Sequence, residues 1–247
     1  MFNKLTEVVL PHIMGLMVHR KETLSPKAQR AQNAYLAKLE VSKRKTKKPV
    51  VVGFLGLVGS GKSSVAQDLA RHIGGTVVEG DAIRVCLRKE GEAYKYVRQI
   101  AENVALEVLK QGRNVVFDSD QADEKKRASV REKIRKIGAR LVFIRTYAEP
   151  HVMFGRMLAA EYRRSPDDFF GGAKTKWEGG TDQQRGAVIK FGEAWRRTPH
   201  HYRWVNEGGG KWMLKKLPFP LLADIDTTDE ANWKSEVKKI AQKLIVS

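Results

Sequence analysis

The stretch "VVVGFLGLVGSGKSSVAQDLA", residues 50–70, decides the fold, because it passes from an apolar run through a glycine-rich turn into a helical pattern. Its turn matches the spacing G-x-x-x-x-G-K-[ST], which begins at Gly56 and ends at Ser63. The motif stands directly after a predicted strand and at the start of a predicted helix, as phosphate binding requires. The stretch therefore predicts a strand, a phosphate-binding turn and a helix in succession.

Each residue type in this turn has a physical reason. Glycines let successive backbone N–H groups point at a phosphate, and the helix N-terminus adds a partial positive charge. We expect Lys62 to reach the β- and γ-phosphates of ATP, Ser63 to bind Mg²⁺, and Ser64 to cap the helix or contact the α-phosphate. A turn that only packs a helix on a strand is the alternative. The predicted nucleotide-binding residues are Gly56, Gly59, Ser60, Gly61, Lys62, Ser63 and Ser64.

The composition and net charge indicate which classes of partner the protein binds. The 247 residues, 42% of them hydrophobic, suffice for one α/β domain with an appendage. Lys and Arg number 46 against 28 Asp and Glu, and the net charge of +18 favours nucleic acid, nucleotides or an acidic membrane surface. Cys86 is the single cysteine, so no intrachain disulfide forms, and the N-terminus lacks a signal-peptide pattern. These features predict a cytoplasmic protein.

Residues 1–49 are predicted to form a basic helical extension and linker, with eleven Lys or Arg against three Asp or Glu. Helices are expected at about 3–20 and at about 26–42, where Ser25 can cap the helix. The apolar run at 8–18 is shorter than the roughly 20 residues that span a bilayer, so it predicts a packed or interfacial helix and no transmembrane segment.

From residue 50 to 247, short apolar runs alternate with longer amphipathic segments, which is typical of βαβ units around a parallel sheet. The fold class is α/β, a three-layer sandwich with a five-stranded parallel sheet. Strands are predicted at 50–57, 75–79, 114–120, 140–147 and 221–227. Helices are predicted at about 62–72, 92–111, 123–137, 150–163 and 229–245.

The interval from 164 to 220 breaks this alternation and offers one helical candidate, at about 182–196. Loops of this length inside a domain are usually lids or disordered segments, so an insertion is predicted at about 150–216. Basic and aromatic residues alternate there, as in proteins that stack single-stranded bases, although the aromatics could equally fill a small core. They are Arg163, Arg164, Lys174, Lys176, Arg185, Lys190, Arg196, Arg197, Arg203 and Lys211 with Phe169, Phe170, Trp177, Trp195, Tyr202, Trp204 and Trp212.

A candidate acceptor site follows the second strand, where "GTVVE" runs into "GDAIR". Asp81 would lie at the carboxyl end of a strand expected to neighbour the first, and ligands of open α/β sheets bind at that end. Asp81 and Arg84 share a face if a helix begins there. The carboxylate could then accept a hydroxyl proton and the arginine hold the acceptor, or Asp81 could simply cap the helix. No Asp-Glu pair, typical of nucleotide-hydrolysing machines, follows the third strand.

The combination of "GLVGSGKSS", "GDAIR", "NVVFDSD" and "RLVFIRTYAEPHVMFGRM" resembles P-loop kinases of the group that includes polynucleotide 5′-hydroxyl kinase and zeta-toxin, within the AAA-type P-loop NTPase superfamily. The resemblance implies that Asp81 is the general base, that Arg84 binds the acceptor or its phosphate, and that Asp118 supports the site. It makes Arg156 the lid arginine over the phosphates. A second family arginine is replaced by Ala160, and the candidates to substitute for it are Arg163 and Arg164 in the next turn.

Together these features predict a Mg²⁺-dependent kinase that transfers the γ-phosphoryl group of ATP to an alcohol. The acceptor is either a polynucleotide 5′-hydroxyl, which the basic charge favours, or a small metabolite such as a sugar nucleotide. A nucleotide-dependent binding or regulatory ATPase is the alternative from another class. The histidines of "PHH", His200 and His201, are expected to be ordinary polar residues, because no metal-ligand spacing accompanies them.

Overall fold

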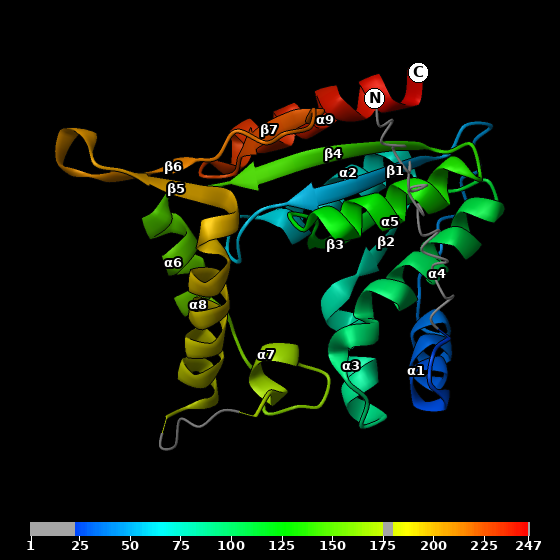
Figure 1. Cartoon of the computed structure of the whole chain (residues 1–247), viewed down its shortest axis with the longest axis horizontal. Coiled ribbons are helices and arrows are strands. Elements are labelled where there is room, and N and C mark those ends of the chain that lie inside the picture. The colour runs from blue at the N-terminus through cyan, green and yellow to red at the C-terminus, as the bar shows by residue number, and fades with distance from the viewer. Residues whose placement is uncertain (1–22, 175–179, 247) are drawn as a thin grey trace, which may run out of the picture.

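Apolar residues on both faces bury strand β1 (Val50–Leu55) along its whole length. Such a strand needs a partner at each edge and helices on each face. In the computed structural model, β3 (Asn114–Asp120) and β4 (Arg140–Tyr147) pair with its two edges in parallel, and β2 (Gly75–Glu79) and β7 (Ala223–Asp226) lie outside them. The order β2-β3-β1-β4-β7 confirms the five-stranded parallel sheet (Figure 1).

The expectation that the second strand neighbours the first is wrong, because β3 lies between β2 and β1. The burial of β2 and β3 explains their order in the sheet. Residues of β2 alternate between buried and half-buried, which suits an edge strand, whereas Val115, Val116 and Phe117 of β3 are buried on both faces. Asp81 therefore follows an outer strand, with the end of β3 between it and the phosphate-binding turn.

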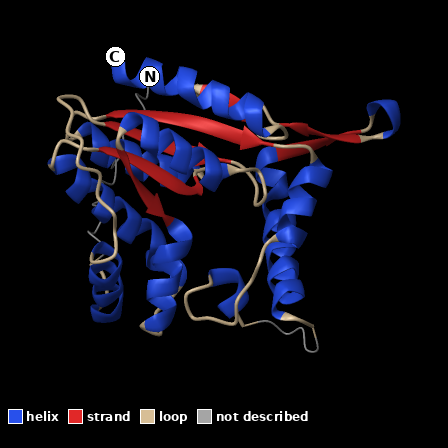
Figure 2. Ribbon diagram, turned by 180° about the vertical axis from the view of Figure 1, so that it is seen from behind, coloured by secondary structure: helices blue, strands red, loops and turns tan. Residues whose placement is uncertain are grey.

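Helices cover both faces of the sheet and complete the predicted three layers (Figure 2). On one face, α2 (Lys62–Ile73) and α9 (Glu230–Val246) pack against each other and against the sheet. On the other, α3 (Gly80–Lys89), α4 (Val97–Lys110) and α5 (Glu124–Arg135) bury a second apolar cluster. A 3₁₀ turn at residues 94–96 precedes α4. Within the helices that the structure describes, none has the length and apolar character needed to cross a membrane.

The structure describes residues 23–174 and 180–246, so the predicted helix at 3–20 and the apolar run at 8–18 lie outside it. Helix α1 (Pro26–Leu36) begins as expected, with the Ser25 hydroxyl accepting the Ala28 N–H at 3.1 Å. It ends earlier than the predicted 26–42 because the following residues run along the core instead. There the Ser42 N–H donates to the Thr76 hydroxyl at 3.0 Å.

The predicted insertion is mostly helical. Helix α6 (Pro150–Ala159) packs against α8 (Asp182–His201), and the short α7 (Phe169–Gly172) lies between α8 and α3. Thr181 and Gln184 form a capping box at the start of α8, which runs five residues beyond the predicted end at 196. The helix ends at His201, because Tyr202 enters a strand that pairs with a segment farther along the chain.

A β-hairpin follows α8 and was absent from the predicted elements. Strands β5 (Tyr202–Val205) and β6 (Lys211–Leu214) pair antiparallel, and a 3₁₀ turn at residues 207–209 joins them. Trp204 and Trp212 pack edge to face at 5.4 Å between ring centroids and remain about half exposed. The "NEGGG" run between two short apolar segments is the signal that predicts such a hairpin.

Two glycines of α8 provide a matched test of the insertion's packing. A methyl group at Gly186 would stand 2.1 Å from the Tyr162 ring, whereas nothing lies within 4 Å of one at Gly192. We expect Gly186→Ala to lower the free energy of unfolding by about 1–3 kcal/mol. Gly192→Ala should raise it by up to about 1 kcal/mol, since alanine favours the helix. Urea unfolding measures both, and equal effects would contradict the packing.

Candidate active site

The phosphate-binding turn connects β1 to α2 and approaches two other segments closely. Gly61 has a φ of 77°, and a side chain there would meet Thr227, in the turn after β7, at 2.8 Å. Gly59 has a φ of 85°, and a side chain there would meet the Met153 carbonyl at 2.7 Å. Only glycine fits both the conformation and the space. Since Gly61 is also the N-cap of α2, no side chain covers the first-turn N–H groups, which are free to bind an anion.

Lys62 bends back over this turn. Its Nζ donates to the carbonyls of Gly56 and Leu57, both at 2.7 Å. Burial lowers the pKa of Lys62, although the nearby charges of Asp120, Asp118 and Asp81 favour its charged form. An ammonium group held away from water beside anion-binding amides is suited to a phosphate.

Asp118 faces the turn from the end of β3. Burial raises the pKa of its carboxyl group, while the Ser63 hydroxyl and the Lys62 ammonium favour the charged form. A hydroxyl beside a carboxylate supplies the oxygen ligands that Mg²⁺ prefers, so these two residues fit the metal. Ser60 is buried, with its hydroxyl 2.9 Å from that of Thr146, and therefore supports the turn, while Ser64 is exposed in the first turn of α2.

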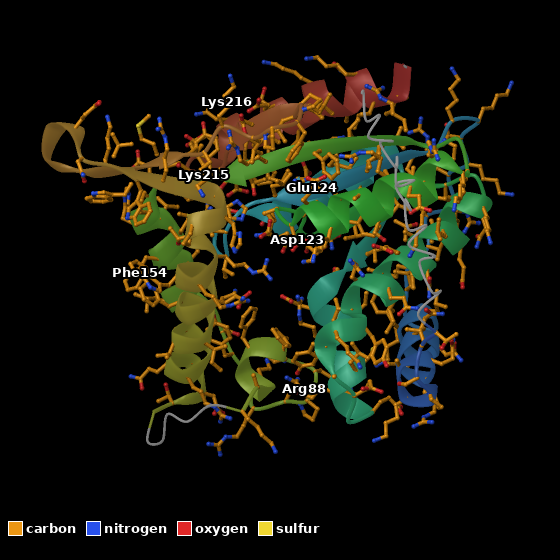
Figure 3. All side chains as sticks on the ribbon, viewed as in Figure 1. Arg88, Asp123, Glu124, Phe154, Lys215 and Lys216 are labelled. Atoms are coloured by element: carbon orange, nitrogen blue, oxygen red, sulfur yellow. The ribbon has the colours of Figure 1, made fainter. Side chains whose placement is uncertain are left out.

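Asp81 and Arg84 occupy one face of α3, as their spacing predicts. The Arg84 guanidinium donates to the Asp81 carboxylate at 2.7 Å, and it also lies 5.5 Å from the centre of the Phe169 ring in α7. Arg88, one turn farther along, donates to the carbonyls of Pro166, Asp168 and Phe169 (Figure 3). These bonds tie α3, which carries Asp81, to the insertion.

Arg156 extends from α6 to the phosphate-binding turn. Its guanidinium donates to the Gly59 carbonyl at 3.1 Å and to the Thr227 hydroxyl at 2.9 Å. The position suits an arginine that closes over phosphates. Arg164, one of the two candidates to substitute for the arginine absent at Ala160, is mostly exposed and pairs with Asp182 at 3.0 Å.

Arg197 of α8 also reaches the site, although the sequence analysis names it only among the basic residues of the insertion and not among the site residues. It donates to the nearly buried Asp120 carboxylate at 3.1 Å, and His201 Nε2 lies 3.0 Å from the same oxygen. Burial raises the pKa of Asp120, but His201, Lys62 and Arg197 outweigh burial and hold it well below its usual range. His201 is thus buried against a carboxylate rather than being an ordinary polar residue. Arg197, His201 and Asp120 come together because α8 extends to residue 201, where it joins the hairpin.

The predicted mixture of basic and aromatic residues divides between two places. Phe169 and Phe170 pack against each other beside α3, whereas Trp195, Trp204 and Trp212 are exposed. Lys176 and Trp177, which belong to the same prediction, lie outside the described residues.

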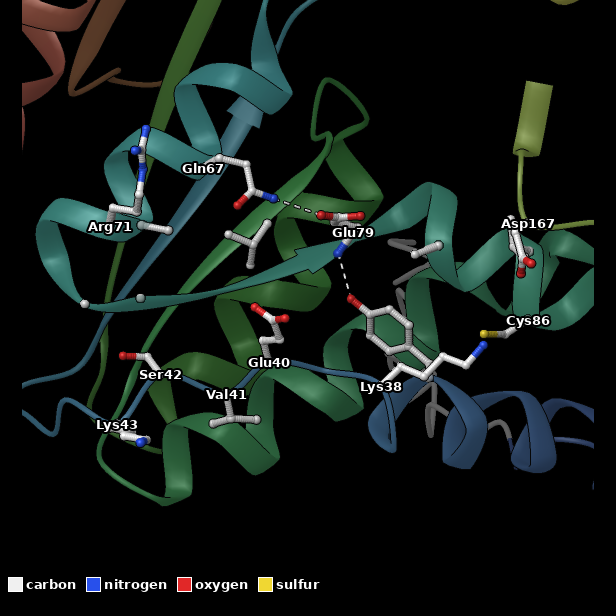
Figure 4. Close-up of a pocket in the computed structure, with 17 residues that line it drawn as sticks. Lys38, Glu40, Val41, Ser42, Lys43, Gln67, Arg71, Glu79, Cys86 and Asp167 are labelled. Atoms are coloured by element: carbon white, nitrogen blue, oxygen red, sulfur yellow. Dashed lines mark hydrogen bonds between the residues drawn. The ribbon is translucent and has the colours of Figure 1, made fainter. Parts of the chain in front are cut away.

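A separate cavity of about 720 Å³ opens beside the edge strand β2 (Figure 4). The segment after α1, the end of α2 and the start of α3 line it, and the Tyr35 hydroxyl there accepts the Glu79 N–H at 2.8 Å. None of the predicted site residues lines it, so the site is defined by its side chains rather than by this cavity.

Residues 50–168 match the protein family described as AAA domain. No curated protein matches the chain. Among solved structures, APE1195 is similar with a TM-score of 0.53 and 17% identity, over 82% of this chain and 99% of that one. A putative kinase from Chloroflexus aurantiacus is similar with a TM-score of 0.50 and 17% identity, over 79% and 98%.

Mycobacterium tuberculosis APS kinase CysC, solved in complex with AMPPNP and APS, has a TM-score of 0.46 and 17% identity, over 81% of this chain and 98% of that one. The sheet, the phosphate-binding turn and the two likenesses with TM-scores of 0.53 and 0.50 show that the chain has the fold of a P-loop NTPase of the kinase type. At these identities the likeness concerns the fold alone.

The Asp120 contacts lead to a stability prediction. Asp120→Asn removes the nearly buried carboxylate that Arg197 and His201 share. We expect a loss of about 3 kcal/mol in the free energy of unfolding. Asp167→Asn is the control, because its ion pair with Lys89 is exposed to solvent and contributes little to stability. Urea denaturation distinguishes them, and equal losses would exclude a structural role for the Asp120 cluster.

Proposed function

We propose that the protein is an ATP-dependent kinase that transfers the γ-phosphoryl group to an acceptor hydroxyl. The observation that carries the proposal is that Lys62, which bends over an anion-binding turn, lies near enough to the carboxylates of Asp120, Asp118 and Asp81 for their charges to favour its charged form. The turn supplies a phosphate site, and the carboxylates supply both a metal-binding group and a base.

The position of each site residue indicates its role in the proposed reaction. The amides of the turn and Lys62 hold the phosphates of ATP, and Ser63 with Asp118 would hold Mg²⁺, which when bound neutralises charge on the phosphate oxygens. Arg156 closes over the turn, where it can stabilise the charge that develops on the transferred group. We assign these roles to the loop residues Gly56, Gly59, Ser60, Gly61, Lys62, Ser63 and Ser64, together with Asp81, Arg84, Asp118 and Arg156.

In the transfer step, the Asp81 carboxylate accepts the proton of the acceptor hydroxyl. The hydroxyl oxygen bonds to the γ-phosphorus, the bond from that phosphorus to the bridging oxygen breaks, and ADP leaves. Asp81 is about half exposed at the start of α3, where an incoming acceptor can reach it, and Arg84 holds its carboxylate in place. The buried Asp118 faces Ser63 and is therefore better placed for the metal than for the acceptor.

Acceptor-dependent release of ADP tests the proposal. Lys62→Ala should abolish transfer because it removes the phosphate ligand, and Asp81→Asn should reduce kcat by at least about 100-fold while leaving ATP binding nearly unchanged. Glu230→Gln is the matched control, because Glu230 also begins a helix and forms an exposed ion pair with Lys234. ADP release that no alcohol or oligonucleotide alters would favour a regulatory ATPase. Loss of ATP binding in the Asp81 variant would indicate a metal or structural role.

Arg156 gives an independent test. We expect Arg156→Ala to lower kcat at least about 100-fold, because an arginine over the transferred group acts mainly on the transition state. Arg164→Ala should leave kcat unchanged, since Arg164 pairs with Asp182. Steady-state kinetics at saturating ATP measures both, and a larger effect at Arg164 would reverse the assignment.

A further inference from the structure

Helices α6 and α8 carry an exposed apolar face on their outer side. Two side chains of α6 and three of α8 stand at helical spacing and are each about half exposed or more: Phe154, Leu158, Val188, Phe191 and Trp195. The rings of Phe154 and Phe191 pack edge to face at 5.8 Å between centroids, which joins the two helices into one surface. Arg156 and Arg197 leave the same helices toward the phosphate-binding turn and Asp120. The apolar face is therefore distinct from the candidate active site.

The β5–β6 hairpin adds a second apolar surface next to this face. Figure 1 shows the hairpin projecting from the end of α8 beyond α6. At the base of the hairpin, Tyr202 packs against the small apolar cluster that includes Met153 of α6. Side chains two residues apart lie on the same face of a strand, so Trp204 and its cross-strand partner Trp212 lie on the face that Tyr202 turns toward α6. The hairpin thus presents its two tryptophans on the side where the helical face begins.

The combined surface has the size of a protein–protein interface. The five aromatic and two aliphatic side chains, each about half exposed, present on the order of 700 Å² when an aromatic side chain is given about 200 Å². The largest apolar patch of a monomeric protein is typically about 300–600 Å². One partner of a stable complex buries about 800 Å², so this surface with its polar rim is sufficient. A two-stranded hairpin is only marginally stable in water, and covering Trp204 and Trp212 would stabilise it.

The charges at the rim of this surface favour a second copy of the chain as its partner. Arg203 and Lys211 are exposed on the hairpin, whereas the exposed acidic residues Glu149 and Glu161 flank the two ends of α6. A hairpin placed on the α6–α8 face of another copy would bring these opposite charges together. Because each copy has both surfaces, a two-fold axis repeats the contact. A flat lipid surface fits less well, since the hairpin projects crosswise to α6 and α8 (Figure 1).

We propose that the protein forms a two-fold symmetric dimer in which Trp204 and Trp212 of each hairpin pack on the α6–α8 face of the other copy, around Phe191 and Trp195. The proposal is independent of the kinase function, because these side chains lie outside the candidate active site. Arg196, the charged neighbour of Trp195, pairs with Glu193 at 2.7 Å in the same helix, so its charge is already balanced beside the contact.

Sedimentation velocity of the full chain over a wide range of concentrations tests the dimer. We expect a reversible change from the mass of one chain to that of two as the concentration rises. Trp195→Glu should raise the dissociation constant at least about 30-fold, because it places a charge in the apolar contact. Leu158→Glu is a second variant, on α6. Ile245→Glu is the matched control, since Ile245 is equally exposed but lies in α9, on the opposite side of the molecule from the hairpin (Figure 1).

Complementation between two variants tests the reciprocal arrangement. Trp204→Glu alters only the hairpin, and Trp195→Lys alters only the helical face. Each variant alone should be monomeric, whereas their equimolar mixture should dimerise. In the mixed dimer one hairpin places a carboxylate against an ammonium group, and the other contact is wild type. A mixture that stays monomeric would overturn the crossed packing of hairpin on helices.

Other results would assign the surface differently. A wild-type chain that stays monomeric at every concentration, or equal weakening by Trp195→Glu and Ile245→Glu, would overturn the dimer. Monomers that bind vesicles of phosphatidylcholine and phosphatidylserine, or a single-stranded oligonucleotide, and lose this binding with Trp204→Glu would assign the surface to that partner instead. At the lowest concentration all variants should melt at the wild-type temperature, because these side chains are exposed in a single copy. A lower melting temperature there would indicate a role within one chain and contradict the proposal.

Discussion

Burial of β1 on both faces is the constraint on which the other elements depend. A strand with no polar face has to lie at the centre of a sheet, with β3 and β4 on its edges and α2 and α4 among the helices on its faces. The turn that leaves this strand is then surrounded by the ends of its neighbours. For that reason Gly59 meets α6, Gly61 meets the turn after β7, and Asp118 faces Ser63.

Arginine side chains form the other side of the site. The insertion brings Arg156 to the phosphate-binding turn and Arg197 to the end of β3, while Arg88 connects it to α3. Each of these arginines donates to carbonyl or carboxylate oxygens of another element. These bonds hold the insertion in place and bring positive charge to the phosphate-binding turn and to the end of β3.

Much of the fold could be predicted because its signals are local. Period and length identified the five strands, and the capping residues Ser25 and Thr181 lie where two helices begin. The hairpin was missed because each of its strands has four residues, too few for a clear alternation. The order of β2 and β3 was wrong because neighbours in a sheet depend on which strands are buried on both faces, a property of the assembled layers.

The sequence by itself determined the phosphate-binding turn, since the glycines, Lys62 and Ser63 act through the backbone that immediately surrounds them. It also determined that Asp81 and Arg84 share a helical face, because their spacing of three residues is a local property. Only the tertiary structure decided which arginines and lysines reach the site. Arg197 is 77 residues from Asp120 in the sequence and Lys126 is 6 residues from it, and both contact Asp120. They do so because α8 ends and α5 begins at the same edge of the sheet.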